Sequence, residues 1–213
     1  MGDYLIKKAM EKKRERVGFF GASFDPIHNG HMNMAIQLLE KCDLDKILFC
    51  PAHISPGKVD TPPEALKNHR LNMVQLATED HPAFIPIDNE LSRPPPSYTI
   101  DTVESLGYKE AELFLIISED VAYTLMEWKG VEKLLNIASP LIGRRFELDA
   151  SKIKAFNPSI RKKVLDGYIS TKTMEISSTT IRKRLKKRLY CAHLLPSKIL
   201  DYIYQNGLYC DGK

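Results

Sequence analysis

Paired cysteines and long apolar runs are both missing from this sequence of 213 residues. Its cysteines, Cys42, Cys50, Cys191 and Cys210, lie far apart and form no CxxC pair, which argues against a disulfide scaffold and a cysteine-based zinc site. No apolar run approaches the roughly 20 residues that a membrane helix requires. Residues 1–16 also lack the apolar core of a secretory signal. We therefore expect a reduced, cytoplasmic protein with no membrane partner.

The composition is that of an ordinary globular chain. Hydrophobic residues make up 43% and charged residues 27% of the sequence, which excludes a disordered chain, a collagen-like chain and a disulfide miniprotein. The length is compatible with one domain and a small appendage, and the sequence shows no internal repeat. We expect an N-terminal extension over residues 1–15 and a single domain over residues 16–210. Residues 176–210 are expected to form the helical C-terminal portion of that domain.

The net charge of +4 comes from one short segment. The segment contains more positive charges than the net charge of the whole chain, so the rest of the sequence is slightly acidic. Its basic residues are Arg182, Lys183, Arg184, Lys186, Lys187 and Arg188. Such a cluster is usually a solvated helix face, but it can also bind phosphate or nucleic acid. The nucleic-acid hypothesis predicts binding that weakens steeply with salt. We expect no nucleic-acid partner, because the cluster is isolated and no aromatic-rich basic sheet accompanies it.

Short apolar segments alternate with amphipathic ones along most of the chain. The apolar segments predict strands over residues 16–21, 46–50, 83–87, 113–117, 140–143 and 173–176. The amphipathic segments predict helices over residues 31–42, 62–76, 98–106, 121–127, 130–137, 178–187 and 195–207. Residues 146–170 are basic and irregular, and we assign no element to them. Strands separated by helices indicate an α/β fold with a parallel sheet covered on both faces.

In a sheet of this kind, ligands bind outside the carboxyl ends of the strands. The loops that follow the predicted strands should therefore carry the function. These loops span residues 21–31, 51–62, 88–99, 118–129 and 177–182.

The first of these loops, residues 21–31, has the sequence GASFDPIHNGH. Its small residues at 21–23 let backbone N–H groups approach an anion closely. His28 and His31 are three residues apart where a helix begins, so their rings can lie on one face beside unpaired N–H groups. This combination indicates a site for phosphate charge. A small-residue turn alone is a weak signal, and the histidines could also bind zinc, although the sequence shows no third ligand nearby.

A second candidate for phosphate binding follows the last predicted strand. Residues 177–180 are all hydroxyl side chains, which can cap a helix and present its N–H groups to an anion. Arg182 comes directly after them, and we expect it to contact phosphate. Residues 184–188 are expected to form a solvated face instead.

The first loop resembles the nucleotidylyltransferase superfamily, whose signature is H-x-G-H after the first strand of a Rossmann-like sheet. GASFDPIHNGH is similar to the form found in nicotinate mononucleotide adenylyltransferases. Further matches to that family follow in order along residues 16–210: PGK at 56–58, PPSYTIDT at 95–102, Trp128, ISSTTIR at 176–182 and an LLP…YI…GLY ending at 194–209. The resemblance implies a Rossmann-like, doubly wound parallel sheet with a small helical C-terminal part.

The resemblance also implies an activity and a set of site residues. The expected reaction joins ATP and nicotinate mononucleotide into deamido-NAD and releases pyrophosphate, as in NAD biosynthesis. The catalytic residues would be His28, His31 and Arg182. ATP would be bound by Gly21, Ser23, Phe24, His28, His31, Ser177, Ser178, Thr179 and Arg182. Nicotinate mononucleotide would be bound by Ala22, Ser23, Lys58, Tyr98, Thr99, Asp120 and Trp128. Mg²⁺ is expected with ATP, held mainly by the phosphates and not by a protein metal site.

Several of these residues also have simpler interpretations. Lys58 could be a solvated loop lysine, Trp128 a core residue, and Asp120 an acid that complements a helix dipole. Two positions depart from the family pattern: Ala22 stands for a second glycine and Ser118 for another. A left-handed backbone at residue 22 would cost about 1 kcal/mol or more.

Two enzyme alternatives stay open, an adenylyltransferase for nicotinamide mononucleotide and one for phosphopantetheine. PPSYT, Trp128 and the chain length favour a pyridine nucleotide over phosphopantetheine. The sequence does not decide between the acid and the amide, nor does it give the oligomeric state.

Overall fold

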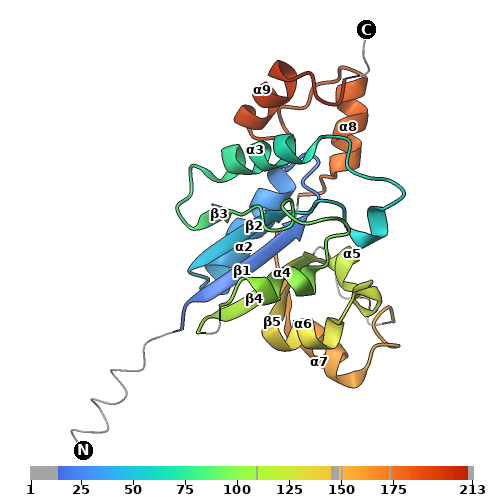
Figure 1. Cartoon of the computed structure of the whole chain (residues 1–213). Coiled ribbons are helices and arrows are strands. Elements are labelled where there is room, and N and C mark those ends of the chain that lie inside the picture. The colour runs from blue at the N-terminus through green and yellow to red at the C-terminus, as the bar shows by residue number, and fades with distance from the viewer. Residues whose placement is uncertain (1–13, 109, 145–148, 150, 173, 211–213) are drawn as a thin grey trace, which may run out of the picture.

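The computed structural model describes residues 14–108, 110–144, 149, 151–172 and 174–210 (Figure 1). This part of the chain contains a six-stranded sheet in the order β3-β2-β1-β4-β5-β6. Every neighbouring pair is parallel. The strands are β1 (Arg16–Ala22), β2 (Lys46–Pro51), β3 (Phe84–Pro86), β4 (Glu112–Ser118), β5 (Ala138–Arg144) and β6 (Tyr168–Ser170). The strand order reverses between β1 and β4, which is where dinucleotide-binding sheets of this order place their ligand.

Helices connect the strands as the sequence predicts for an α/β fold. They are α2 (Asn29–Lys41), α3 (Lys67–Thr78), α4 (Thr99–Ser105), α5 (Glu119–Ala122), α6 (Val131–Ile137), α7 (Pro158–Asp166), α8 (Ser178–Lys186) and α9 (Ser197–Gln205). Two single-turn 3₁₀ helices, η1 (Pro56–Lys58) and η2 (Leu125–Glu127), lie in the connections after β2 and β4. Within the described residues, no helix is both long and apolar enough to cross a lipid bilayer.

The central strands have apolar side chains on both faces, so the sheet separates two hydrophobic cores. In β4, Phe114 and Ile116 pack into one core, whereas the alternating residues Leu113, Leu115 and Ile117 pack into the other. A parallel strand buried on both sides has this continuous apolar sequence, because successive side chains point to opposite faces.

Each core is closed by its own set of helices. The first core contains buried residues of α2, α3, α8 and α9, and the second contains buried residues of α4, α5, α6 and α7. Figure 1 shows α3, α8 and α9 on one side of the sheet and α4, α6 and α7 on the other. The prediction of a doubly wound parallel sheet with a small helical C-terminal part is confirmed.

Two predicted element boundaries are wrong. The helix predicted over residues 62–76 begins only at Lys67, because Leu66 has an extended backbone (φ −57°, ψ 154°). The amides of Glu64 and Ala65 instead donate to the carboxylate of Asp25, at 2.8 and 3.1 Å. The single helix predicted over residues 121–127 is two short helices, α5 and η2, with Tyr123 and Thr124 between them.

The edge of the sheet also differs from the prediction. A strand was expected over residues 173–176; Thr173 lies outside the described residues, and residues 174–176 form no strand. The edge strand is β6, which pairs with β5 through Ile142 and Tyr168. The segment 146–170, to which no element was assigned, contains β6 and α7. Asn157 caps α7 by accepting from the amide of Ser159, which is the local signal for this helix.

Gly167, the C-cap of α7, lies close to the backbone of β5. A Cβ at this position would lie 2.3 Å from the carbonyl oxygen of Pro140. Gly167→Ala is therefore expected to lower the free energy of unfolding by about 1–3 kcal/mol, measured by urea denaturation. Gly57→Ala is the control, because a Cβ there meets no atom within 4 Å. Equal stability of the two variants would contradict this packing.

Candidate active site

A cavity of about 390 Å³ opens at the carboxyl ends of β1, β4 and β5. Its walls are the loop over residues 21–31, the ends of these strands, η1 and the start of α8. Twelve of the residues that the sequence predicts for the site line it: Gly21, Ala22, Ser23, Phe24, His28, His31, Lys58, Asp120, Ser177, Ser178, Thr179 and Arg182. The folded chain thus gathers two motifs about 150 residues apart around one space.

His28 and His31 cap the start of α2 reciprocally. The amide of His31 donates to Nδ1 of His28 at 3.3 Å, and the amide of His28 donates to Nδ1 of His31 at 3.2 Å. The two rings stack with their centroids 3.6 Å apart. Because Nδ1 of each ring is an acceptor, the proton of each neutral ring must be on Nε2. The cap therefore fixes both the orientation and the tautomer of the pair.

His31 is held in its neutral form by its surroundings. Its ring meets Phe24 edge-to-face at a centroid distance of 5.1 Å and Phe20 at 5.9 Å. Burial among these rings lowers the pKa of His31 well below its ordinary value, and the nearby charges of His28 and Lys58 lower this pKa further. A neutral imidazole with its proton on Nε2 is a hydrogen-bond donor for phosphate oxygens.

Lys58 reaches from η1 to the first loop. Its Nζ donates to Oγ of Ser23 at 3.0 Å. Partial burial and the positive charge of Arg182 lower the pKa of Lys58 from its usual value. A lysine whose pKa is lowered by a neighbouring arginine lies in a positively charged site that favours an anion.

The start of α8 forms the opposite wall of the cavity. Ser177 caps the helix by accepting from the amide of Thr180 at 3.1 Å, and the hydroxyl of Ser178 donates to the carbonyl oxygen of Pro26 at 2.9 Å. The latter bond joins α8 to the first loop. The helix thus presents its N-terminal end, with its partial positive charge, to the cavity.

Arg182 lies one turn into α8 and is anchored by acidic residues. Its Nε donates to Oε1 of Glu64 at 2.8 Å, and its Nη1 donates to the carbonyl oxygen of Asp25 at 2.8 Å. Nη1 also lies 3.6 Å from Oδ2 of Asp25. Glu64 in addition binds Lys186 at 2.9 Å.

The sequence analysis missed a buried arginine that shapes the site. Arg70 is 1% exposed and donates to main-chain carbonyls of Ser23 (2.7 Å), Ala52 (2.5 Å), His53 (3.0 Å) and Ala65 (3.2 Å). It therefore ties the loops after β1 and β2 to α3. Its position was readable, because Arg70 precedes the buried Met73 and Val74 by three and four residues on the same face of α3.

Glu64 and Tyr209 were missed as well. Both contact Asp25, a residue for which the sequence analysis proposed no role of its own. The hydroxyl of Tyr209 donates to Oδ1 of Asp25 at 2.7 Å. No sequence signal connects residues 184 positions apart, so only the folded chain shows this contact.

The two departures from the family glycines are accommodated by the backbone. Ala22 is the last residue of β1, opposite Pro51, so its side chain needs no left-handed conformation. The left-handed residue of this loop is Phe24, at φ 46°. Ser118 lies at the N-cap of α5 with φ −81°.

Comparison with known proteins places the chain in a family. The family model described as cytidylyltransferase-like matches residues 19–184. The nicotinate-nucleotide adenylyltransferase of Bacillus subtilis is 34% identical over 92% of this chain and 98% of its own length. A protein of Methylacidiphilum infernorum, named a probable nicotinate-nucleotide adenylyltransferase, is 37% identical over 91% of this chain and 92% of its own length. The chain belongs to the nicotinate-nucleotide adenylyltransferase family.

Solved structures with this family's fold superpose on nearly the whole chain. The nicotinic acid mononucleotide adenylyltransferase of Plasmodium falciparum, complexed with NaAD, has a TM-score of 0.72 and 22% identity and covers 92% of this chain and 98% of its own. The same enzyme complexed with APC has a TM-score of 0.70 and 20% identity, with coverage of 92% and 98%. The likeness supports the Rossmann-like fold.

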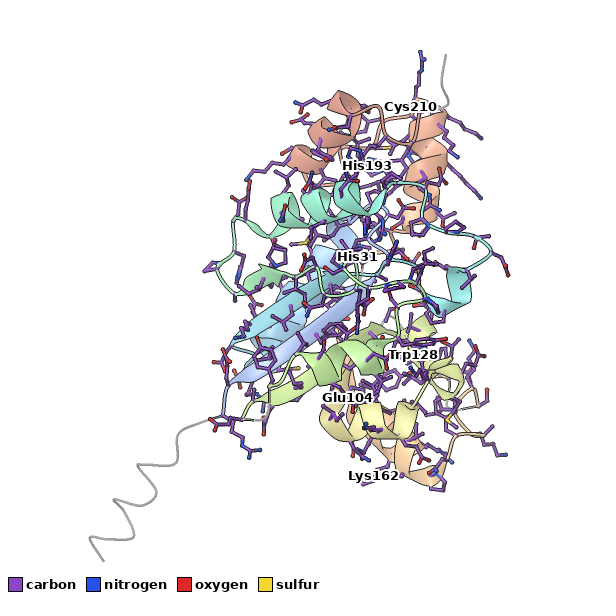
Figure 2. The ribbon with its side chains drawn as sticks, viewed as in Figure 1. His31, Glu104, Trp128, Lys162, His193 and Cys210 are labelled. Carbon is purple, nitrogen blue, oxygen red and sulfur yellow. The ribbon has the colours of Figure 1, made fainter. Side chains whose placement is uncertain are left out.

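Three residues predicted for nicotinate mononucleotide binding in this adenylyltransferase family do not line the cavity. Tyr98 and Thr99 lie at the start of α4 and Trp128 directly follows η2, with Tyr98 and Trp128 packed against the second core; Figure 2 shows Trp128 apart from His31. Tyr98 is the N-cap of α4, and its ring lies 4.5 Å from Nζ of Lys129. Lys129 also binds both carboxylate oxygens of Asp101 at 3.0 Å. Tyr98 and Lys129, the residue after Trp128, therefore contact each other outside the residues that line the cavity.

The low pKa of His31 in this adenylyltransferase fold makes stability depend on pH. Below pH 6.5, the ordinary value for histidine, the unfolded chain takes up a proton that the folded chain does not, so acid favours unfolding. From about pH 7.5 to about pH 5.5, we expect the wild type to lose roughly 1–1.5 kcal/mol more than His31→Asn, measured by urea denaturation. Asparagine keeps an acceptor near the position of Nδ1.

His193→Asn is the control for this measurement, because His193 is exposed and lies outside the cavity. It should follow the wild-type pH dependence. Parallel curves for the wild type and His31→Asn would show that His31 titrates alike in the folded and unfolded chains, against the expectation.

Proposed function

We propose that this chain transfers the AMP moiety of ATP to nicotinate mononucleotide, giving deamido-NAD and pyrophosphate. The observation that carries this proposal is the convergence of two capped histidines, Lys58, Arg182 and the start of α8 on one cavity at the switch point of the sheet. These are donors and cations suited to a chain of phosphates. The names of the relatives support the same activity.

The chemistry needs no protein nucleophile. A phosphate oxygen of the mononucleotide attacks the α-phosphorus of ATP, a new P–O bond forms, and the bond to the β-phosphate oxygen breaks. The electron pair of that bond leaves with pyrophosphate. The attacking phosphate monoester is already anionic near neutral pH, so the site has to align two anions and stabilise the charge that develops. Alignment of bound reactants can supply about 7–11 kcal/mol of the barrier.

Each wall of the cavity contributes to that stabilisation. The neutral His31 ring donates from Nε2 without adding a charge that would hold the product tightly. Lys58 and Arg182 approach from two sides and offset the negative charge of the triphosphate, and Ser177, Ser178 and Thr179 bring the N-terminal end of α8 to the same anion. Hydrogen bonds to charged groups are about twice as strong as neutral ones.

Mg²⁺ would enter this site together with ATP. Within the described residues, no group of three or more His, Cys, Asp or Glu side chains is placed to hold a metal ion. The carboxylate of Asp25 is already engaged by Glu64, Ala65 and Tyr209. The donor set therefore fits a magnesium ion carried by the substrate phosphates, where it would neutralise part of their charge.

The basic segment over residues 182–188 supports a nucleic-acid partner less well than the cavity supports a small-molecule substrate. Arg182 and Lys186 both bind Glu64, and Arg184 donates to the carbonyl oxygen of Tyr190 at 2.8 Å. Half of the cluster is thus used in contacts within the chain. We propose that the protein acts in the cytoplasm on small-molecule substrates, without a nucleic-acid or membrane partner.

The acceptor is tested by pyrophosphate release from ATP and Mg²⁺ with nicotinate mononucleotide, nicotinamide mononucleotide and phosphopantetheine in parallel. We expect turnover with the nicotinate nucleotide to exceed that with the amide by at least about tenfold, a difference of about 1.4 kcal/mol in transition-state binding. Faster turnover with either other acceptor would reassign the substrate. No release with any of them, in a folded sample, would contradict an adenylyltransferase.

His31→Asn tests the catalytic role of the capped pair. The variant keeps an acceptor for the amide of His28 but lacks the Nε2 donor, so kcat should fall by about 10²–10³-fold while the protein stays folded. Circular dichroism and urea denaturation check the fold at about pH 7.5, where His31 of the wild type is neutral in the folded chain and largely neutral in the unfolded chain. His193→Asn is again the matched control, and a His31→Asn variant with near wild-type kcat would remove His31 from the mechanism.

A further inference from the structure

We infer that Tyr209 positions Arg182 for phosphate through the buried carboxylate of Asp25, with Glu64 holding the other edge of the guanidinium. This inference rests on the proposed function and assigns roles to three residues that do not follow from the H-x-G-H motif. It makes the segment after α9 part of the machinery that serves the cavity.

Asp25 is the centre of this arrangement. Asp25 is 4% exposed, and both of its carboxylate oxygens accept hydrogen bonds from within the chain. Oδ1 accepts from the hydroxyl of Tyr209 at 2.7 Å and from the amide of Ala65 at 3.1 Å, and Oδ2 accepts from the amide of Glu64 at 2.8 Å. These hydrogen bonds give both oxygens of the buried carboxylate the partners without which its burial would be costly.

The same loop and its neighbour fix the plane of Arg182. Asp25 contacts Nη1 through its main-chain carbonyl at 2.8 Å and through Oδ2 at 3.6 Å, whereas Glu64 binds Nε at 2.8 Å. A guanidinium is planar, so two anchors on different nitrogens set the direction of its other N–H groups. Arg182 lines the cavity, and that direction decides how it meets a phosphate.

The turn that follows α9 determines the position of Tyr209. Gly207 and Tyr209 both have left-handed backbones, at φ 60° and 58°. This turn leaves Tyr209 only 7% exposed, with its hydroxyl hydrogen-bonded to Asp25. Burial raises the pKa of this hydroxyl, and the neighbouring Asp25 raises it further, so the group stays a donor. A left-handed tyrosine is uncommon and is kept where its surroundings require it.

The C-terminal portion makes two further hydrogen bonds to the first loop, so the positions of the two segments depend on each other. The amide of Asn29 donates to the carbonyl oxygen of Leu194 at 3.0 Å, and the hydroxyl of Ser178 donates to the carbonyl oxygen of Pro26 at 2.9 Å. Because small displacements of a positioned charge reduce catalysis strongly, a loosened Asp25 should be felt at Arg182.

Tyr209→Phe tests the inference, since it removes only the hydroxyl. We expect kcat to fall by about tenfold with an unchanged KM for nicotinate mononucleotide. In the Arg182→Ala background, whose residual turnover is slow, the same substitution should change kcat by less than about twofold, because Tyr209 acts through Arg182. Tyr204→Phe is the control; Tyr204 lies on α9 and is 55% exposed.

Glu64→Ala provides a second variant if Tyr209→Phe folds poorly, because the Glu64 side chain is 39% exposed. It should lower kcat by about tenfold, again only when Arg182 is present. Glu79→Ala is its control, since Glu79 pairs with Lys198 away from the cavity.

Three results would overturn the inference. The first is a wild-type kcat in both variants, and the second is an equal loss of kcat with and without Arg182. The third is a lower KM for ATP in Glu64→Ala without loss of kcat, which would show that Glu64 competes with phosphate. Each is measured against an active wild type, so an inactive wild type would contradict the proposed function instead.

Discussion

The cavity depends on the reciprocal cap formed by His28 and His31. One pair of hydrogen bonds caps the start of α2, gives Nδ1 of each ring an amide donor and so places both ring protons on Nε2. The His31 ring packs against Phe20 and Phe24, and burial lowers its pKa, which favours the neutral form. Structural and chemical roles therefore rest on the same atoms. A substitution that spares the helix must still supply an acceptor at Nδ1.

Buried charge organises the loops around this cap. Arg70 collects four main-chain carbonyls from three segments, and Asp25 collects donors from the loop before α3 and from Tyr209. Burying either group without partners would cost several kcal/mol, so each one favours only the loop arrangement that satisfies it. Such residues stabilise one arrangement of the connections after β1 and β2, which form walls of the cavity.

The sequence was sufficient for features that depend on local pattern. The parallel sheet follows from apolar periodicity, and the small-residue turn with His28 and His31 and the hydroxyl run before Arg182 mark two candidate sites that the structure places on one cavity. The reciprocal cap between the two histidines is seen only in the folded chain. Contacts set by tertiary packing could not be read in the same way. The pairing of Tyr209 with Asp25 spans 184 residues, and the start of α3 at Lys67 depends on amides held by that same carboxylate. The edge strand β6 was missed because three residues carry too little periodicity.

The link between Tyr209 and Asp25 also has a consequence for synthesis on the ribosome. Asp25 is made 184 residues before its tyrosine partner, which at about 5–20 residues per second is a delay of roughly 10–40 s. During that interval the carboxylate can have its amide partners from the segment before α3, but its third donor does not yet exist. In the nascent chain, the loop over residues 21–31 therefore lacks one of its contacts, and the hydrogen bond between Tyr209 and Asp25 forms only when the residues after α9 leave the exit tunnel.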